Sequence, residues 1–424
     1  MVGKAARVLI AQIARTPVVS ATDHSQLLRA SDWLLAVTIA GLPLYLVRWR
    51  YGPLPTTLLE TLILVTAVVY AVARWRDGWR RPIATPLDIP IVLLLLAGAI
   101  SVIVPSDHRT ALGLYRAFFV EPVVIFYVGA DLLRRPESVR RAIGALAIGS
   151  TILALLNIGA FVQAFAAHAV KVGSAPTALY GDANFVAMYL EPVAAIAAGV
   201  FIYSRGWWRW MGAAWLGIST LALLLTFSKI AYLAIAVLAV AAILMLRRWR
   251  WPALAGFLLV GLVVSQVPLV KERWLYASDS LAGRVEIWEA AVRTLLAHPI
   301  FGVGLGGFHY LYRDRQEQPY PHDLWLAMWV EIGLLGLLVF AFIFIGLLVR
   351  GLRAWPRASG IHRAALWGAI LSLVMWAVHG VFDTPYFKND MSVEFWVVAA
   401  ITVTAAWSVA PTRSGDADRL ARTA

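Results

Sequence analysis

The feature that most constrains this chain is a series of apolar runs, each about twenty residues long, that recurs along almost its whole length. The runs occupy residues 31–47, 54–73, 87–104, 111–133, 142–167, 183–203, 207–226, 229–246, 251–270, 322–349, 362–383 and 391–410. Runs of this length and composition are typical of helices that cross a bilayer. We therefore predict an all-α polytopic membrane protein with about 12 transmembrane helices.

The composition supports the same class. Of the 424 residues, 61% are hydrophobic and 14% charged, and the mean hydropathy is +0.74. A soluble chain of this length would carry more polar surface. The absence of cysteine excludes disulfides, thiolate metal sites and a thiol nucleophile. The net charge of +13 does not indicate a nucleic-acid partner, because a basic excess in a membrane protein usually lies in cytoplasmic loops next to the lipid bilayer.

The positions of the basic residues predict the orientation. If the N-terminus is cytoplasmic, the inside segments hold 24 of the 37 Lys and Arg residues, with at least two in each segment. These residues lie at positions 4–29, 74–81, 134–141, 205–209, 247–250, 350–363 and 413–422. Positive charge concentrates on the cytoplasmic side of membrane proteins. Both termini are then cytoplasmic, and the interval 271–321 faces outward, which in a bacterium is the periplasm or the cell exterior.

Five regions follow from this reading. Residues 1–30 form a cytoplasmic segment with a short amphipathic helix, and no signal-peptide core or cleavage site is evident there. Residues 31–270 hold the first nine transmembrane helices, residues 271–321 form one long periplasmic loop, and residues 322–410 hold the last three helices. The polar tail 411–424 is expected to be disordered and cytoplasmic.

Three ionisable residues stand where the orientation gives no reason for them. Lys229 lies in TFSKIAYL, between two apolar runs, and Arg116 and Glu121 lie inside the run LYRAFFVEPVVIF. Charges at membrane depth usually face a cavity or a partner. Arg116 and Glu121 are five residues apart, which is not ideal helical spacing, so pairing with each other or with another helix stands beside a binding role. For Lys229 the alternative to a functional role is snorkelling to the membrane surface.

The stretch AGRVEIWEAAVRTLLAHP predicts an amphipathic helix within the long loop, opened by Arg284. Such a helix can lie on the membrane surface. That placement does not account for Arg284 itself, because an arginine at a helix start opposes the helix dipole. Its guanidinium would, however, suit bidentate contact with a phosphate.

A glycine cluster follows this predicted helix. Gly302, Gly304, Gly306 and Gly307 occur in GVGLGGF, after His298-Pro299 and without the strand–turn–helix context of a dinucleotide fingerprint. The pattern favours a tight turn or a close helix approach over a phosphate cradle.

Two His/Asp pairs flank the last three apolar runs. His322 and Asp323 follow Pro321 at the start of a long run, where an imidazole is suited to proton transfer. His379 and Asp383 are four residues apart and are expected to share one helical face. Together the four residues could form a metal site, but mixtures of this kind are weak signals. With no Walker, nucleophile or early acidic metal-binding motif in the sequence, we predict no metal and no cofactor.

Four motifs resemble the O-antigen ligase and O-antigen polymerase (Wzy) superfamily, and the likeness covers most of the chain. They are LYGDANFVAMYLEP (179–192), LLTFSKIAYLAI (224–235), AGRVEIWEAAVRTLLAHPIFGVGLGGF (282–308) and PHDLWLAMWVEIGLLGLLVF (321–340). The last two resemble the hallmark pair of the family, an Arg-led helix with a P-x-x-G-x-G turn and a His-led helix with E-x-G-x-x-G. The resemblance implies a GT-C-like helical bundle with one long periplasmic loop.

The resemblance also implies an activity, that of a metal-independent, inverting glycosyltransferase using an undecaprenyl-diphosphate-linked glycan as donor. Lys229 and Arg284 would bind the diphosphate, with Arg116 as a further contact, and His322 would act on the acceptor hydroxyl as base or orienting group. The secondary candidates are His379, Asp383, Asp323 and Asn184. The chain departs from the commonest pattern at Lys229, where arginine is usual, and at Asp323, where asparagine often stands. The lysine keeps the charge but loses the bidentate fork.

The acceptor remains open within this resemblance. A ligase transfers glycan to lipid A–core and a polymerase to a growing glycan, and transfer to protein is a third option. The modest length slightly favours a ligase over protein transfer. From another class, a transporter of an anionic or lipid-linked substrate would predict inverted repeats and broken helices, which the sequence does not display. An assembly scaffold would give no reason for outward-facing charges.

Overall fold

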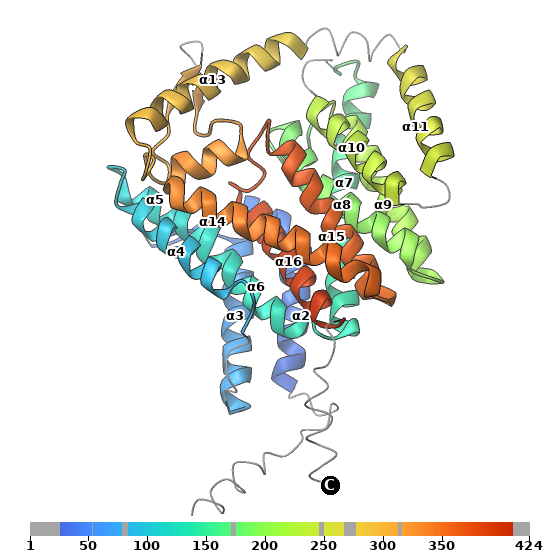
Figure 1. Cartoon of the computed structure of the whole chain (residues 1–424), viewed down its shortest axis with the longest axis horizontal. Helices are drawn as coiled ribbons and strands as arrows, with labels where there is room; N and C mark the ends of the chain where they lie inside the picture. The colour runs from blue at the N-terminus through green and yellow to red at the C-terminus, as the bar shows by residue number, and fades with distance from the viewer. Residues whose placement is uncertain are drawn as a thin grey trace, which may run out of the picture.

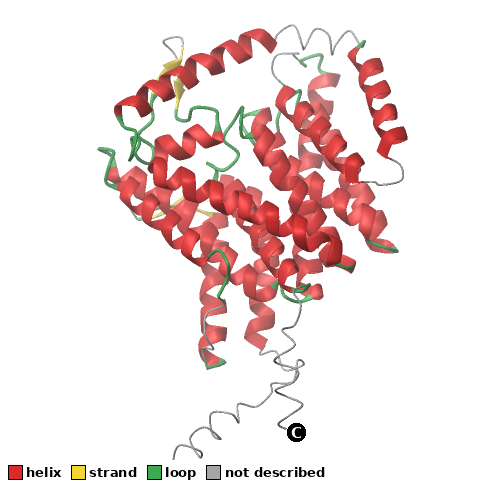
Figure 2. Cartoon of the chain, in the orientation of Figure 1, coloured by secondary structure: helices red, strands yellow, loops and turns green. Residues whose placement is uncertain are grey.

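The computed structural model describes residues 26–52, 54–78, 84–170, 175–245, 250–266, 277–312 and 316–409, and it is mostly helical (Figure 2). The N-terminal segment up to residue 25, with its expected amphipathic helix, lies outside the described residues. So does the tail from Pro411, for which disorder is predicted.

Each of the twelve apolar runs contains at least one helix (Figure 1). They are α2 (Gln26–Ala40), α3 (Leu58–Arg76), α4 (Asp88–Val102), α5 (His108–Tyr115) with α6 (Glu121–Leu132), α7 (Pro136–Ala166), α8 (Ala183–Tyr203), α9 (Trp207–Leu225), α10 (Lys229–Met245), α11 (Arg250–Ser265), α14 (Leu324–Ala354), α15 (Gly360–His379) and α16 (Asn389–Trp407). Within the described residues, seven helices are long and apolar enough to cross a membrane by length and composition. The chain is therefore a multi-pass membrane protein, and the number of about 12 spans stays a prediction.

Smaller elements were not predicted. A π-helical turn, η2 (Arg116–Val120), joins α5 to α6, and 3₁₀ helices occupy η1 (Leu42–Leu46) and η3 (Trp355–Arg357). Two antiparallel hairpins also occur in the described part of the chain (Figure 2). They pair β1 (Arg48–Tyr51) with β2 (Leu54–Thr57), and β3 (Tyr310–Tyr312) with β4 (Gln316–Gln318).

Local sequence explains several helix starts. Thr57 and Glu60 form a reciprocal capping box at the start of α3. Asp323 accepts a hydrogen bond from the backbone N–H of Leu326, which caps α14. Ser228 accepts one from the N–H of Ala231, just ahead of Lys229 and the start of α10. Short polar side chains in TFSK and PHD thus fix where two membrane helices begin.

The core is organised around α8, α15 and α16. α15 packs on α8, α10 and α16, while α16 also packs on α6 and α14. Almost every residue of α16 is buried. Aromatic rings fill the space between α14 and α16, with Phe340 against Phe395 at 5.4 Å and Phe395 against Trp396 at 5.7 Å between centroids. A helix that is enclosed on all sides gives the loops at its ends a rigid support.

Helix α13 (Ala277–Ala297) lies across one end of the bundle (Figure 1). It buries Ile287, Ala291 and Leu295 against Phe308 and Val330. Its exposed apolar side chains are Leu281, Val285, Val292 and Leu296. The predicted amphipathic helix is therefore present, but it begins seven residues before Arg284. The prediction that Arg284 opens the helix was wrong. Because Arg284 lies inside α13 and not in its first turn, the helix dipole does not oppose its charge.

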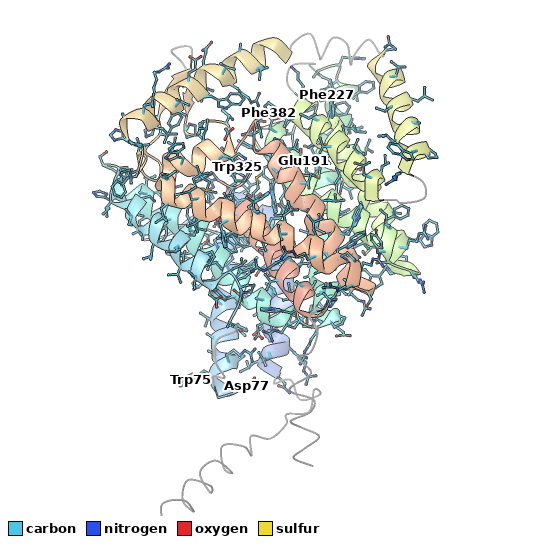
Figure 3. All side chains as sticks on the ribbon, in the orientation of Figure 1. Trp75, Asp77, Glu191, Phe227, Trp325 and Phe382 are labelled. Atoms are coloured by element: carbon cyan, nitrogen blue, oxygen red, sulfur yellow. The ribbon has the colours of Figure 1, made fainter. Side chains whose placement is uncertain are left out.

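Helix α15 connects the two ends of the bundle. Its twenty residues span about 30 Å, close to the thickness of a bilayer core. Phe382, just beyond its last residue, lies at the end covered by α13, as do Phe227 and Glu191 (Figure 3). Trp75, in the last turn of α3, and Asp77, its C-cap residue, lie at the opposite end (Figure 3).

Candidate active site

The carboxylate of Asp383 joins two of the predicted site residues. His322 Nδ1 lies 3.1 Å from Asp383 Oδ1, and Arg284 Nη2 lies 3.9 Å from Asp383 Oδ2. The three residues come from the loop before α14, from α13 and from the loop after α15. Asp383 is almost fully buried, whereas the side chains of Arg284 and His322 are 15% and 29% exposed. Two partly accessible groups thus share one buried carboxylate.

The backbone around His322 is held in an uncommon conformation. Its φ is +50°, which is rare for a residue other than glycine and is often found where surrounding structure imposes a function. The indole N–H of Trp288 donates to the His322 carbonyl at 3.3 Å, and the N–H of Leu324 donates to the carbonyl of Gly380 at 2.6 Å. These bonds tie the His322 loop both to α13 and to the loop that carries Asp383.

Arg284 is fixed by a second contact on that loop. Its Nε donates to the Phe382 carbonyl at 2.7 Å. The ring of Phe382 lies 6.3 Å from that of Trp288, so an aromatic pair adjoins the guanidinium. Because Nε is engaged by a backbone carbonyl and Nη2 faces Asp383, the plane of the guanidinium is set by the protein before any ligand arrives.

Asp383 is the charged partner that this cluster keeps ionised. Burial alone would raise the pKa of its carboxyl. The hydrogen bond and charge of His322, with the charges of His379 and Arg284, outweigh burial and lower the pKa of Asp383 to about 2. The carboxylate is therefore negative at any physiological pH.

The predicted pairing of His379 with Asp383 on one helical face was wrong. α15 ends at His379, and Asp383 lies beyond the helix end, where only its backbone N–H bonds to the His379 carbonyl. The imidazole of His379 instead contacts Glu191 of α8, with Nδ1 2.8 Å from Oε1 and both side chains at most 2% exposed. This buried pair lies at the end of α15 and supports the loop that follows, which carries Asp383. Glu191 was not singled out from the sequence, although a carboxylate inside an apolar run is a signal for a partner.

Lys229 is the first residue of α10, which packs on α8 and α15. Phe227, two residues earlier, has φ of +52° and lies at the α13 end of the bundle (Figure 3). Lys229 therefore begins its helix at the same end as Asp383. The convergence of Lys229 and Arg284 on one ligand stays a prediction.

Lys388, the N-cap residue of α16, is a further cation near this cluster. Its Nζ lies 3.2 Å from the ring centroid of Phe185, next to Asn184 at the start of α8. Burial lowers the pKa of Lys388, and the charges of Asp390, Asp383 and Asp182 oppose that shift. The backbone N–H of Asn184 donates to Asp182. The secondary candidate Asn184 thus lies close to Lys388, and a direct role for it stays a prediction.

Arg116 engages two carboxylates. Its Nη2 is 2.8 Å from Glu60 and its Nε 3.1 Å from Glu121. The π-helical turn makes the second contact possible, because it stacks residues five apart, as an α-helix does not. This arrangement fits the interpretation of Arg116 as an ion-pair residue better than that of a phosphate ligand.

The glycine cluster packs against a break in α14. Ile332 and Gly333 leave the helical conformation, and Gly333 has φ of +73°. A Cβ on Gly302 would lie 2.2 Å from the Val330 carbonyl, and one on Gly333 would lie 2.6 Å from the Ile300 carbonyl. The turn at residues 299–304 and the break at Ile332–Gly333, here called the two hallmark turns, therefore lie in close contact with each other. This agrees with the favoured interpretation of the glycine cluster as a close approach.

Asp323 and the possible metal site formed by the two His/Asp pairs are the last candidates from the sequence. The Asp323 carboxylate caps α14, and burial raises the pKa of its carboxyl. Within the described residues, no group of three or more His, Asp or Glu side chains is gathered as a metal ion would need. His379 pairs with Glu191 and His322 with Asp383, so the four residues of the two His/Asp pairs do not form one ligand set.

The fold and this cluster define a class: a polytopic helical membrane protein with a cationic, histidine-containing site where α13 covers the bundle. The family model for O-antigen ligase matches residues 212–341, which include Lys229, Arg284 and His322. This match confirms the resemblance that the motifs carry. A search of curated proteins found no match. The family indicates a membrane enzyme that transfers glycosyl groups.

Proposed function

We propose that the protein transfers an O-antigen-type glycan from undecaprenyl diphosphate to an acceptor hydroxyl on lipid A–core, at the periplasmic face of the bacterial inner membrane. The observation that carries this proposal is the contact of one buried carboxylate, that of Asp383, with both His322 and Arg284. It joins a proton-accepting group to an anion-binding group, and transfer from a diphosphate needs both.

His322 is the proposed base. When Nδ1 donates its hydrogen to Asp383, the neutral imidazole carries its lone pair on Nε2. Nε2 then takes the proton of the acceptor hydroxyl as its oxygen attacks the anomeric carbon. The bond between that carbon and the phosphate oxygen breaks, and the lipid diphosphate leaves with the electron pair. Attack from the side opposite the leaving group inverts the anomeric centre. Asp383 is a positioning residue, since it fixes the tautomer and stabilises the imidazolium.

Arg284 and Lys229 are the proposed partners of the leaving diphosphate. Positive groups aimed at the bond that breaks stabilise the growing charge on its oxygen. Arg284 is already oriented by Phe382 and Asp383, so little reorganisation is needed on binding. Lys229 approaches from the start of α10 as a point charge rather than a fork. Arg116 is a lesser candidate, because its guanidinium contacts Glu60 and Glu121.

A polymerase of the same superfamily, which extends a glycan chain, would use the same residues. The two functions differ in the acceptor alone, and the family match is compatible with either. Transfer to lipid A–core is our first proposal because the family model that matches the chain is described as O-antigen ligase.

The test is glycan transfer by purified protein, with a synthetic undecaprenyl-diphosphate glycan offered to lipid A–core and to a glycan acceptor, with and without EDTA. Arg284→Ala and His322→Ala are expected to lower transfer by a factor of about 10² or more at unchanged expression. Product on lipid A–core identifies a ligase, and a lengthened glycan identifies a polymerase. Full activity in both variants would refute the site, and loss with EDTA would contradict a metal-independent reaction.

A further inference from the structure

A second cationic site lies at the opposite end of the bundle. A cavity of about 720 Å³ is lined by Arg140, Arg205, Arg209 and Arg363, with Trp208 and Ser359 among its other lining residues. The arginines come from the starts of α7, α9 and α15 and from the turn after α8. All four belong to segments that the charge pattern predicts to be cytoplasmic. Three separate inside segments thus converge on one hollow.

The cavity has a strong charge imbalance. Its described lining residues include four arginines and no Asp or Glu. Arg140 approaches Glu137 only at 4.0 Å, and both side chains are well exposed. Arg363 stacks on the rings of Tyr203 and Trp355, at 5.2 and 5.3 Å, while its buried Nε has no hydrogen-bond partner. Four guanidinium groups at one hollow repel one another unless an anion lies between them.

Two helix starts add to this field. α9 begins after Gly206 and α15 after Ser359, and neither N-cap residue supplies a side-chain hydrogen bond. The first N–H groups of each helix carry partial positive charge. Because Ser359 and Trp208 line the cavity, both helix ends border it. The backbone and the arginines therefore favour the same kind of ligand, a multiply charged anion.

The surroundings favour a lipid over a soluble anion. Trp207 and Trp210 are 77% and 69% exposed beside the cavity, and Ile202 is partly exposed on its wall. Exposed tryptophans at the ends of membrane helices are typical of the level of the lipid headgroups. Basic pockets between helices on the cytoplasmic side suit phosphate-bearing headgroups. The cavity also lies within the size range of small-ligand sites.

We propose that this cavity binds the headgroup of an anionic phospholipid of the cytoplasmic leaflet, and that a headgroup with two phosphates fits it best. Two phosphates would each face two arginines, and the acyl chains would run along the exposed apolar surface next to Trp207 and Trp210. The site lies about 30 Å from Asp383, at the other end of α15, and does not rest on the proposed glycan transfer.

The test is native mass spectrometry of the full-length protein in a non-ionic detergent, titrated with diphosphatidylglycerol, with phosphatidylcholine or with inorganic pyrophosphate. Wild-type protein is expected to retain diphosphatidylglycerol in preference to both other probes. Arg205→Gln should weaken binding about fivefold, and Arg140→Gln with Arg205→Gln about 25-fold. Both side chains are exposed, so the fold should tolerate these changes, and unfolding temperatures will verify it.

The matched control compares Arg205→Glu with Arg76→Glu, since both reverse one exposed charge on the same predicted side. Only Arg205→Glu should lose the lipid. Equal losses in the two variants, equal binding of phosphatidylcholine, or no lipid bound to the wild type would overturn the proposal. Pyrophosphate binding as tight as that of the lipid would show a site for a soluble anion and would also overturn it.

Discussion

At the α13 end of the bundle, one carboxylate serves two partners, His322 and Arg284, whereas at the other end of α15 four arginines surround a cavity with no carboxylate among its described lining residues. The two ends are joined by the same helix, α15. They differ in how positive charge is balanced. At the first end the Asp383 carboxylate holds Arg284 and His322 in place, and at the second the balancing charge is left to a ligand.

Other arginines on the predicted cytoplasmic side provide a reference for this difference. Arg74 pairs with Asp131 and Arg141 pairs with Asp32, each in a one-to-one ion pair between neighbouring helices. Ion pairs of this kind, like those of Arg116 with Glu60 and Glu121, hold helices together. The sharing of Asp383, and a cavity with no Asp or Glu among its described lining residues, both differ from these ion pairs, which is why we interpret both as ligand sites.

The strongest test of this difference between the two ends removes the carboxylate charge that Asp383 shares between His322 and Arg284. Asp383→Asn keeps the size of the side chain but offers His322 an amide, which can hold the wrong tautomer. Such a change is expected to lower glycan transfer by a factor of about 10³–10⁴. The measurement is initial rate with the lipid-linked donor, together with its pH profile, which a purely structural role would not shift.

Asp323 provides the matched control, since it adjoins His322 in sequence but only caps α14. Asparagine caps a helix about as well as aspartate, so Asp323→Asn should change the rate by no more than about twofold. Equal losses in the two variants would mean that Asp383 holds the loop and does not act through His322.

Much of the helical framework could be predicted from the sequence. The run 183–203 has the same bounds as α8, and the run 207–226 ends within one residue of α9. Apolar periodicity and caps such as Asp323 are local, and local signals suffice for such elements. The run 362–383 extended too far, because α15 ends where the Gly380 carbonyl accepts a hydrogen bond from Leu324, a contact that no local signal carries.

The π-helical turn illustrates what sequence alone could not supply. Pro122 has no N–H to bond within its helix, and the carbonyls of Phe118 and Ala117 accept from Tyr386 and Asn389, more than 260 residues away. Arg116 and Glu121 were recognised as conspicuous, but their pairing depends on that distant support. The same holds for the site: His322, Arg284 and Asp383 were each named, while the sharing of one carboxylate emerged only from packing.

A second test compares the stability effects of replacing one glycine at each end of the bundle. Gly333→Ala places a Cβ 2.6 Å from the Ile300 carbonyl at a residue with φ of +73°. Strain and overpacking together should lower the free energy of unfolding by about 2–4 kcal/mol. At Gly206 φ is +58° but the space around a Cβ is open, so Gly206→Ala should cost only about 1 kcal/mol. Thermal unfolding in detergent measures both, and equal shifts would contradict the close approach of the two hallmark turns.

The smallest expected effect concerns the acid response of the two aspartates beside His322. The pKa of Asp383 is lowered to about 2, so its ionised form adds stability that is complete above about pH 4 and is lost as the pH falls towards 2. The shift corresponds to about 2 kcal/mol. The pKa of Asp323 is raised by burial, so its charge costs stability near neutral pH, and this cost disappears on protonation.

Unfolding temperatures near neutral pH and at about pH 2.5 should therefore show the gap between wild type and Asp383→Asn closing in acid. The advantage of Asp323→Asn over wild type should fade in the same interval. A gap for Asp383→Asn that is unchanged in acid would mean that the carboxylate is not held ionised by His322 and Arg284.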